Sequence, residues 1–234
     1  MPGVSRRCRL DDKMIKSMRK SRVNQLKSRY PALPARFYDR ATVDVALDLL
    51  GKELLRWTPQ GVTAGMIVEV EAYLPQRDPA CHTYRGRTPR NEVMFGPAGL
   101  AYVYSIHARY CLNAVTESPG QGCAVLIRAV EPVTGIELMQ MRRGQVKQRD
   151  LTRGPARLCE AFGLDRRFNG LDLTGSADLW LSRGKKRPKS LRIMRSARIG
   201  VTEPRHRCLR FFLADNEYVS GPRKMLGMGP VRRN

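Results

Sequence analysis

The chain has 234 residues, 42% of them hydrophobic, which suffices for one substantial hydrophobic core. Its net charge of +22 at pH 7 is typical of proteins that bind a polyanion, although a basic surface that serves only solubility is the alternative. No apolar run is long enough to span a membrane, and no secretory signal is visible. We therefore expect no membrane partner and no secretion: the protein should be cytoplasmic, at the nucleoid, in a bacterium, or nuclear in a eukaryote.

Six cysteines are spread through the chain, without a CxxC pair and without the Cys/His spacing typical of zinc sites. An even number of cysteines allows disulfides, but a chain of this size can build its core without them. We therefore expect reduced thiols and no metal site.

The first thirty residues carry ten Lys or Arg against two Asp, and few apolar residues recur there at helical spacing. This pattern predicts a flexible basic arm over residues 1–34 that contacts phosphates, and a tail without a role is the alternative. Pro31 and Pro34 mark its end, because proline restricts the preceding residue to extended conformations. A globular domain is expected over residues 35–234.

The next residues predict a helix followed by a β-hairpin. Apolar residues share one helical face over residues 42–50. Strands are predicted over residues 52–57 and 62–73, because turn residues at 59–61 separate two runs of strand-like sequence.

Strands outnumber helices in the rest of the chain. Residues 77–97 show no period, and a long loop in a compact domain indicates either a functional segment or a wrong assignment of elements. A capping box, Thr134 with Glu137, predicts the start of a short helix. Further strands are predicted over residues 101–106, 123–130, 193–201 and 209–214, and a further helix over residues 155–162. This composition favours an α+β fold with a mainly antiparallel sheet.

The strand over residues 62–73 carries two closely spaced acids. Side chains alternate along a strand, so Glu69, Glu71 and Tyr73 point to one face. An acidic spot is unexpected in so basic a protein. A carboxylate can act as general base on water, and it can stabilise a cation that develops in the transition state. Hydrolysis of an N-glycosidic bond requires both, because water attacks a sugar that becomes oxocarbenium-like. A salt bridge to a nearby arginine is the alternative interpretation.

Aromatic residues gather in the stretch from Ile67 to Tyr110, which holds five tyrosines and two of the three histidines. Aromatic faces stack on nucleotide bases, and a base flipped out of a duplex is held between such side chains. For each tyrosine taken alone, a place in the core or at its rim is the favoured interpretation. The motifs of zinc deaminases and of phosphate-binding P-loops are absent from the sequence.

Six runs of the chain resemble the 3-methyladenine (alkylpurine) DNA glycosylase family of the mammalian alkyladenine glycosylase type. They read AGMIVEVEAYLPQRDPACHTYRGRTPRNEVMFGPAGLAYVY, RYCLNAVTE, AVLIRAVEP, GPARLCEAFGLD, ARIGV and LRFF, and extend over about residues 36–220. The resemblance implies a single mixed domain, an α+β fold on a curved, mainly antiparallel sheet with short helices. It also implies catalysis without a metal or cofactor.

The resemblance further implies a set of site residues. Glu71 stands where the family has its general base, and Arg128 where an arginine helps to hold the attacking water. Four further residues stand where the family binds the flipped base: Tyr73, His82, Tyr104 and Asn113. The asparagine at its position disfavours normal guanine, because the exocyclic amino group of guanine would clash with it.

The chain departs from the family at His107 and Ala108, where a tyrosine followed by glycine is usual. The residue at this place is the wedge that enters the gap left by the flipped nucleotide. We expect His107 to be the DNA-intercalating residue, with less stacking area than a tyrosine.

Together these features predict a monofunctional DNA glycosylase of base excision repair that acts as a monomer on duplex DNA. It would flip damaged purines, alkylated or deaminated, out of the duplex, hydrolyse the glycosidic bond and leave an abasic site. The alternative is a catalytically weakened homologue that only binds nucleic acid through its basic surface.

Overall fold

The computed structural model describes residues 6–76, 78–184, 192–201, 207–221 and 229–231. In chain order its elements are α1 (Arg6–Arg29), α2 (Ala35–Tyr38), α3 (Thr42–Leu49), β1 (Glu53–Thr58), β2 (Gly61–Tyr73), the 3-10 helix η1 (Glu92–Phe95), β3 (Ala101–Ile106), β4 (Arg109–Thr116), β5 (Cys123–Thr134), α4 (Ile136–Arg143), η2 (Gln148–Asp150), α5 (Pro155–Phe162), η3 (Arg166–Phe168), β6 (Leu179–Ser182), β7 (Ile193–Ser196) and β8 (Arg210–Leu213).

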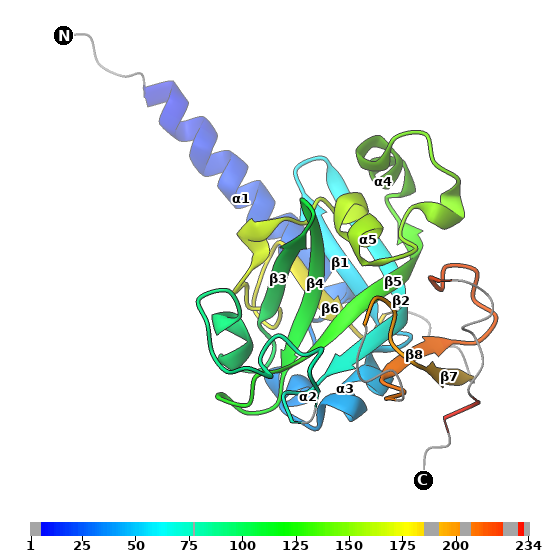
Figure 1. Cartoon of the computed structure of the whole chain (residues 1–234). Coiled ribbons are helices and arrows are strands. Elements are labelled where there is room, and N and C mark those ends of the chain that lie inside the picture. The colour runs from blue at the N-terminus through cyan, green and yellow to red at the C-terminus, as the bar shows by residue number, and fades with distance from the viewer. Residues whose placement is uncertain (1–5, 77, 185–191, 202–206, 222–228, 232–234) are drawn as a thin grey trace.

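Eight strands of the described residues form one curled sheet (Figure 1). Its strand order is β3-β4-β5-β2-β1-β6, and β8 pairs with both β2 and β7. All of these strand pairs are antiparallel. The expected α+β fold on a curved, mainly antiparallel sheet with short helices is therefore confirmed.

The long strand β2 lies at the centre of the sheet. Its first half pairs with β1 through the predicted hairpin, its second half pairs with β8, and β5 lies along its other side. Ile67 and Val70 are fully buried, and burial of such a side chain contributes about 1.5–3 kcal/mol. The second half of β2 therefore has a paired strand on each side, and the polar side chains of Glu69 and Glu71 that it carries are fully buried.

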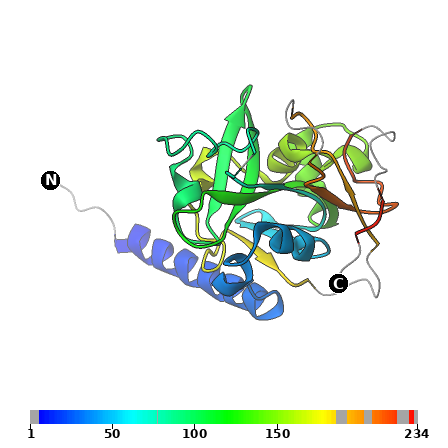
Figure 2. The ribbon, with the colours of Figure 1, turned by 60° about the horizontal axis from the view of Figure 1, so that its bottom comes forward.

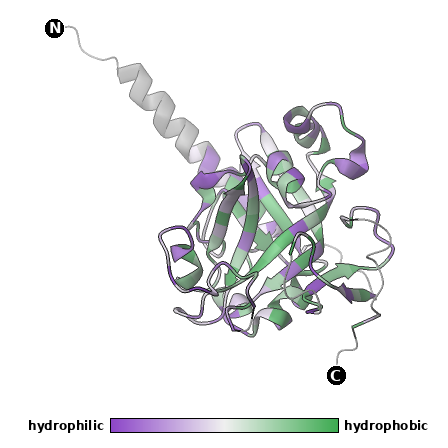
Figure 3. Ribbon diagram, in the orientation of Figure 1, coloured by the Kyte–Doolittle hydropathy of each residue, from purple (hydrophilic) through white to green (hydrophobic). Residues whose placement is uncertain are grey.

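Short helices cover the sheet. α3 packs against β2 and β5 with Val45, Ala46 and Leu49 in the core, and α5 packs against β4 and β5 with α4 beside it. In Figure 2 the sheet runs between α3 and the α4–α5 pair. Figure 3 shows hydrophobic residues concentrated on the central strands and hydrophilic residues on α4. The main core therefore lies along the sheet, under these helices.

The β3–β4 hairpin carries the predicted wedge, although the sequence did not predict β4. Ile106 pairs with Arg109, so the turn consists of His107 and Ala108 alone. Both residues have positive φ, 46° and 60°, as two-residue turns require to follow the twist of the strands. Non-glycine residues rarely adopt this conformation. The exposed tip projects from the body of the molecule at the top of Figure 2.

The N-terminal arm is helical over Arg6–Arg29, although few of its apolar residues recur at helical spacing. The expected flexibility of the arm stays a prediction. Lysine, arginine, methionine and leucine favour helices even where no amphipathic pattern is present. Near its end α1 packs Val23 and Leu26 against Trp57 and Trp180. Contact of this arm with phosphates stays a prediction. No helix among the described residues is both long and apolar enough to cross a membrane.

Two smaller differences have local causes. Gly135 adopts a left-handed φ of 72° and begins α4 without a side-chain cap, so the predicted capping box of Thr134 and Glu137 was wrong. β7 ends at Ser196 rather than at residue 201, because the chain leaves the sheet there and buries Arg198. Cys81, Cys111, Cys123 and Cys159 are buried free thiols, as expected.

Candidate active site

Two carboxylates from β2 form the centre of the candidate site. Glu69 and Glu71 have no exposed surface. They project from the face of the sheet, where Arg128, Arg210 and the backbone at Ile199 and Ser220 contact them. The β2–β5 pairing shifts register between Ile67 and Val70 and leaves Arg128 outside the paired positions. Such irregularities redirect side chains beside active sites. Here the shift accompanies an arginine that contacts both carboxylates.

Glu69 is held on both oxygens by positive or donating groups. Its Oε1 accepts from Arg128 Nε at 3.1 Å and from Arg210 Nε at 2.6 Å. Ser220 donates its backbone N–H to Oε2 at 2.7 Å and its hydroxyl to Oε1 at 2.9 Å. Burial alone raises the pKa of the Glu69 carboxyl, but the two arginines outweigh it and lower this pKa. Both carboxylate oxygens of Glu69 therefore already accept hydrogen bonds from fixed donors, and the group has little capacity to accept a proton.

Glu71 has fewer partners and lies nearer the aromatic residues. Its Oε2 accepts from the Tyr73 hydroxyl at 2.9 Å and from Arg128 Nη1 at 3.2 Å. Its Oε1 accepts the backbone N–H of Ile199 at 2.8 Å. These bonds orient the carboxylate, and only one arginine pairs with it. Of the two acids, Glu71 is the one that can serve as a base.

Arg128 bridges the two acids from β5. It is 7% exposed and also donates Nη2 to the Ser220 hydroxyl at 3.3 Å. Burial alone lowers the pKa of Arg128, but Glu71 and Glu69 outweigh it and raise this pKa. A permanent cation beside Glu71 can hold a water molecule through the donors of its planar guanidinium. Both acids thus form salt bridges to Arg128, as the alternative interpretation expects, and the role of Glu71 as general base stays a prediction.

An aromatic pocket lies next to Glu71 and collects the predicted base-binding residues. It is lined by Tyr73, Ala80, His82, Met94, Tyr102, Tyr104 and Asn113. Its volume of about 10 Å³ accommodates roughly one water molecule. The Tyr102 and Tyr104 rings stack with centroids 5.4 Å apart, and His82 meets Tyr104 edge to face at 4.5 Å. The rings fill the pocket, so a planar ligand can enter only if they separate.

His82 lies at the exposed edge of this pocket. Its Nδ1 shares a 2.8 Å hydrogen bond with the Tyr102 hydroxyl, and its carbonyl accepts Asn91 Nδ2 at 2.8 Å. Desolvation of the ring and the nearby Arg90 lower the pKa of His82, so the imidazole is neutral at neutral pH. A neutral ring with Nδ1 engaged leaves Nε2 for hydrogen bonding to a ligand.

Asn113 and His107 occupy opposite extremes of the β3–β4 hairpin. Asn113 is 3% exposed at the pocket, and its Nδ2 donates to the Tyr102 carbonyl at 3.0 Å. His107 does not line the pocket; it lies at the exposed tip. The structure therefore brings six of the seven predicted residues into one site and places the seventh, His107, away from it at the tip of the β3–β4 hairpin. Their roles stay predictions.

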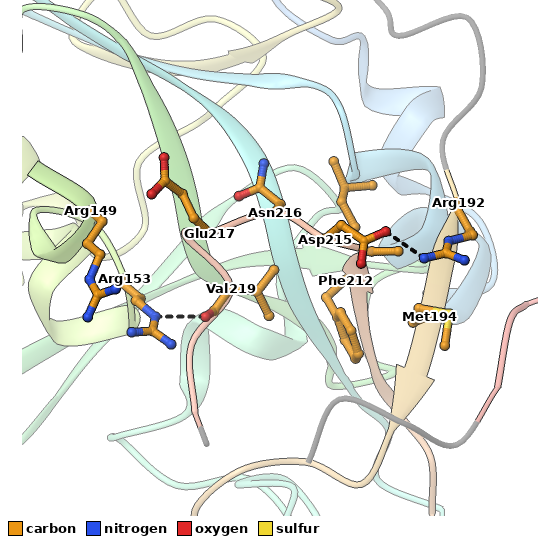
Figure 4. Close-up of a pocket in the computed structure, with 11 residues that line it drawn as sticks. Arg149, Arg153, Arg192, Met194, Phe212, Asp215, Asn216, Glu217 and Val219 are labelled. Carbon is orange, nitrogen blue, oxygen red and sulfur yellow. Dashed lines mark hydrogen bonds and ion pairs between the residues drawn. The ribbon is translucent and has the colours of Figure 1, made fainter. Parts of the chain in front are cut away.

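A much larger cavity, of about 640 Å³, lies elsewhere and contains none of the predicted residues (Figure 4). Arg192 pairs there with Asp215, and Arg153 donates to the Val219 carbonyl at 2.8 Å. The arginines that line it are thus occupied in part by protein groups. Among the described residues no group of three or more His, Cys, Asp and Glu is arranged to hold a metal ion.

The sequence analysis missed the residues that support the acids from the C-terminal third of the chain. Arg210 and Ser220 hold Glu69, and the Arg198–Ile199 pair contacts Tyr73 and Glu71. An arginine inside an apolar run was the available signal, since LRFF contains Arg210 and ARIGV contains Arg198. Arg128 also lies inside an apolar run, AVLIRAVEP.

Comparison with known proteins gives a consistent result. A family model described as Methylpurine-DNA glycosylase (MPG) matches residues 36–217. Relatives carry the provisional name 3-methyladenine DNA glycosylase. One from Carboxydothermus hydrogenoformans is 46% identical over 189 residues, 80% of this chain and 98% of the relative. One from Methanoculleus marisnigri is 49% identical over 193 residues, with the same shares. One from Mesorhizobium japonicum is 45% identical over 185 residues, 79% of this chain and 88% of the relative.

Proposed function

Because this chain belongs to the methylpurine-DNA glycosylase family, we propose that it excises damaged purines, alkylated ones above all, from duplex DNA. It is a hydrolase that acts on N-glycosyl bonds, and its substrate is DNA. The proposal adds the class of base, the flipping of the nucleotide and the roles of the site residues.

One observation carries the assignment of roles: the hydrogen bond from the Tyr73 hydroxyl to Glu71 Oε2, at 2.9 Å. Tyr73 lines the aromatic pocket, whereas Glu71 lies in the buried charge network. This bond joins a surface that can stack on a base to a carboxylate that can activate water. A sugar attached to a base in the pocket would therefore stand next to the acid.

The reaction follows from this arrangement. A purine held between Tyr73 and Tyr104, with His82 at its edge, places C1′ of its sugar toward Glu71 and Arg128. Arg128 donates hydrogen bonds to a water molecule, and Glu71 takes a proton from it as the oxygen attacks C1′. The bond from C1′ to the purine nitrogen breaks, and its electron pair leaves with the base. An alkylated purine already carries positive charge, so it departs neutral, and an abasic site remains.

Binding must include opening of the pocket, since about 10 Å³ cannot hold a purine. The stacked Tyr102 and Tyr104 rings and the neutral His82 would part around the incoming base. Stacking on aromatic faces contributes about 1–3 kcal/mol per base in nucleic-acid complexes, which offsets the ring contacts that are lost. Asn113, fixed by its bond to the Tyr102 carbonyl, would then exclude the amino group of guanine.

The hairpin tip and the net charge of the protein account for binding to the duplex. Lys and Arg contacts to phosphates provide affinity without sequence preference, and salt weakens them. His107, exposed beside Ile106 on the β3–β4 turn, would enter the gap left by the flipped nucleotide. Ile106 adds an apolar side chain to this wedge.

The test is release of free purine from alkylated duplex DNA, with a chelator present, by the wild type and by Glu71→Gln. We expect the wild type to release purine and the variant to be slower by roughly 10²–10⁴-fold, the usual contribution of a general base. Affinity for undamaged duplex should be equal or higher in the variant, because a negative charge is lost. Equal rates for the two proteins would refute the role of Glu71, and no release by the wild type would refute the proposed substrate.

A further inference from the structure

Arg198 follows β7 and is buried, with 5% of its surface exposed. Its guanidinium binds the Asp78 carboxylate with two hydrogen bonds, Nη1 to Oδ2 at 2.7 Å and Nη2 to Oδ1 at 2.5 Å. Nη1 also donates to the Ala72 carbonyl at 3.0 Å. Within the described residues, these are its hydrogen bonds, and both partners belong to β2 or to the loop that follows it.

The same arginine supports Tyr73. Its central carbon lies 4.5 Å from the centroid of the Tyr73 ring, a stacked cation–π arrangement. Arg198 does not line the aromatic pocket, so it contacts Tyr73 away from the space that the pocket encloses. The next residue, Ile199, donates its N–H to Glu71. One dipeptide therefore contacts both the stacking ring and the catalytic carboxylate.

Asp78 extends the support to the loop that carries His82. The Asp78 carbonyl accepts the N–H of Cys81 at 2.8 Å, which closes the turn just before His82. Its carboxylate also accepts the N–H of Leu74 at 3.4 Å. A fully buried carboxylate needs its partners, so the loop and Arg198 are tied to each other.

We propose that Arg198 and Asp78 act as one positioning unit that fixes Tyr73 and the His82 loop around the target base. This inference rests on the proposed function, because it assigns the unit to that same site. A buried ion pair that serves stability alone would not need every contact to converge on the site. The planar, bidentate geometry also specifies arginine, since lysine can neither stack flat on the ring nor bind both carboxylate oxygens.

The experiment measures single-turnover rate constants for release of an alkylated purine, with enzyme in excess, for Arg198→Lys, Asp78→Asn and the double variant. Arg198→Lys keeps the buried positive charge, so it is the variant least apt to unfold. We expect each single variant to lose on the order of 10-fold to 100-fold in rate constant, the typical effect of misplaced substrate-binding groups. The double variant should lose no more than the worse single one, because residues that act as a unit are not additive.

Arg56→Lys is the matched control. Arg56 also stacks on an aromatic ring, at 4.6 Å from Phe168, and donates to backbone carbonyls, but it lies on β1 away from the pocket. Its rate constant should stay within about twofold of the wild type, well below the loss that misplaced groups cause. Affinity for undamaged duplex should be unchanged in all variants.

The readouts separate positioning from folding. With enzyme in saturating excess, loss of part of the folded protein leaves the single-turnover rate constant unchanged, whereas misplacement of the base lowers it. Unchanged rate constants in Arg198→Lys, or a double variant whose loss equals the product of the single losses, would overturn the inference. Absence of release by the wild type and the Arg56→Lys control would instead refute the proposed function.

Discussion

Glu69 and Glu71 stand two residues apart on one strand, are equally buried and share Arg128, yet their surroundings differ. Glu69 is enclosed by a second arginine and by both donors of Ser220. Glu71 has a tyrosine hydroxyl and one backbone N–H in their place. The comparison shows that burial and charge alone do not identify a catalytic acid. The two carboxylates differ in the number of fixed donors around them, and the one with fewer donors, Glu71, is the proposed base.

The difference also separates stability from chemistry. Glu69 neutralises two buried arginines, so its loss leaves positive charge without compensation. Glu71 contributes one of several contacts to Arg128, so its replacement by an isosteric amide leaves the network mostly intact. The two variants Glu69→Gln and Glu71→Gln should therefore fail in different ways.

The largest expected effect on stability is that of Glu69→Gln. Removing one partner of a buried ion pair costs about 3–5 kcal/mol, whereas Glu71→Gln should cost about 1 kcal/mol. Urea unfolding of both variants measures the free energy of unfolding directly. Similar values for the two would mean that the acids are equivalent supports and that the comparison fails.

Arg128→Lys should impair catalysis strongly. A lysine is a single point donor and cannot bond Glu69, Glu71 and the Ser220 hydroxyl at once. We expect the single-turnover rate constant to fall by roughly 10-fold to 100-fold, because Arg128 would no longer hold the attacking water and Glu71 in fixed positions relative to each other. Arg157→Lys is the control, since Arg157 pairs with Asp150 at the surface. An active Arg128→Lys enzyme would show that charge suffices at this position.

A smaller effect is expected in how the free energy of unfolding changes as the pH falls below neutrality. The folded pKa of Glu69 lies below its unfolded value, so its contribution is complete above the unfolded pKa and is lost as pH falls toward the folded one. Between about pH 5 and pH 3 the wild type should therefore lose stability more steeply than Glu69→Gln. Unfolding free energies at several pH values test this. Parallel slopes would mean that Glu69 does not couple folding to protons.

The sequence predicted the parts of the site that depend on local rules. Alternation along a strand placed Glu69, Glu71 and Tyr73 together, and they do share one network. The resemblance added Arg128 and the pocket residues, which the structure gathers around the same strand end. Both kinds of signal lie in the segment that forms β2 to β5.

The supporting residues could not be predicted in the same way. Arg210 reaches Glu69 only because β8 pairs with the second half of β2, and such long-range pairing leaves no periodic mark in the sequence. The role of Arg198 depends on where the chain leaves β7, a boundary that the apolar pattern placed five residues too late. Helix α1 was missed because its contact with the body involves few apolar residues.

The buried thiols bear on how well the protein resists chemical modification by alkylating reagents. Cys81, Cys111, Cys123 and Cys159 are all buried, and desolvation raises the pKa of each, to about 12 for Cys123. A thiol attacks electrophiles as the thiolate, so these sulfurs are poor nucleophiles. The reagents that methylate purines also methylate reactive sulfur. A repair protein with its thiols protonated and enclosed can outlast the chemical exposure whose products it removes.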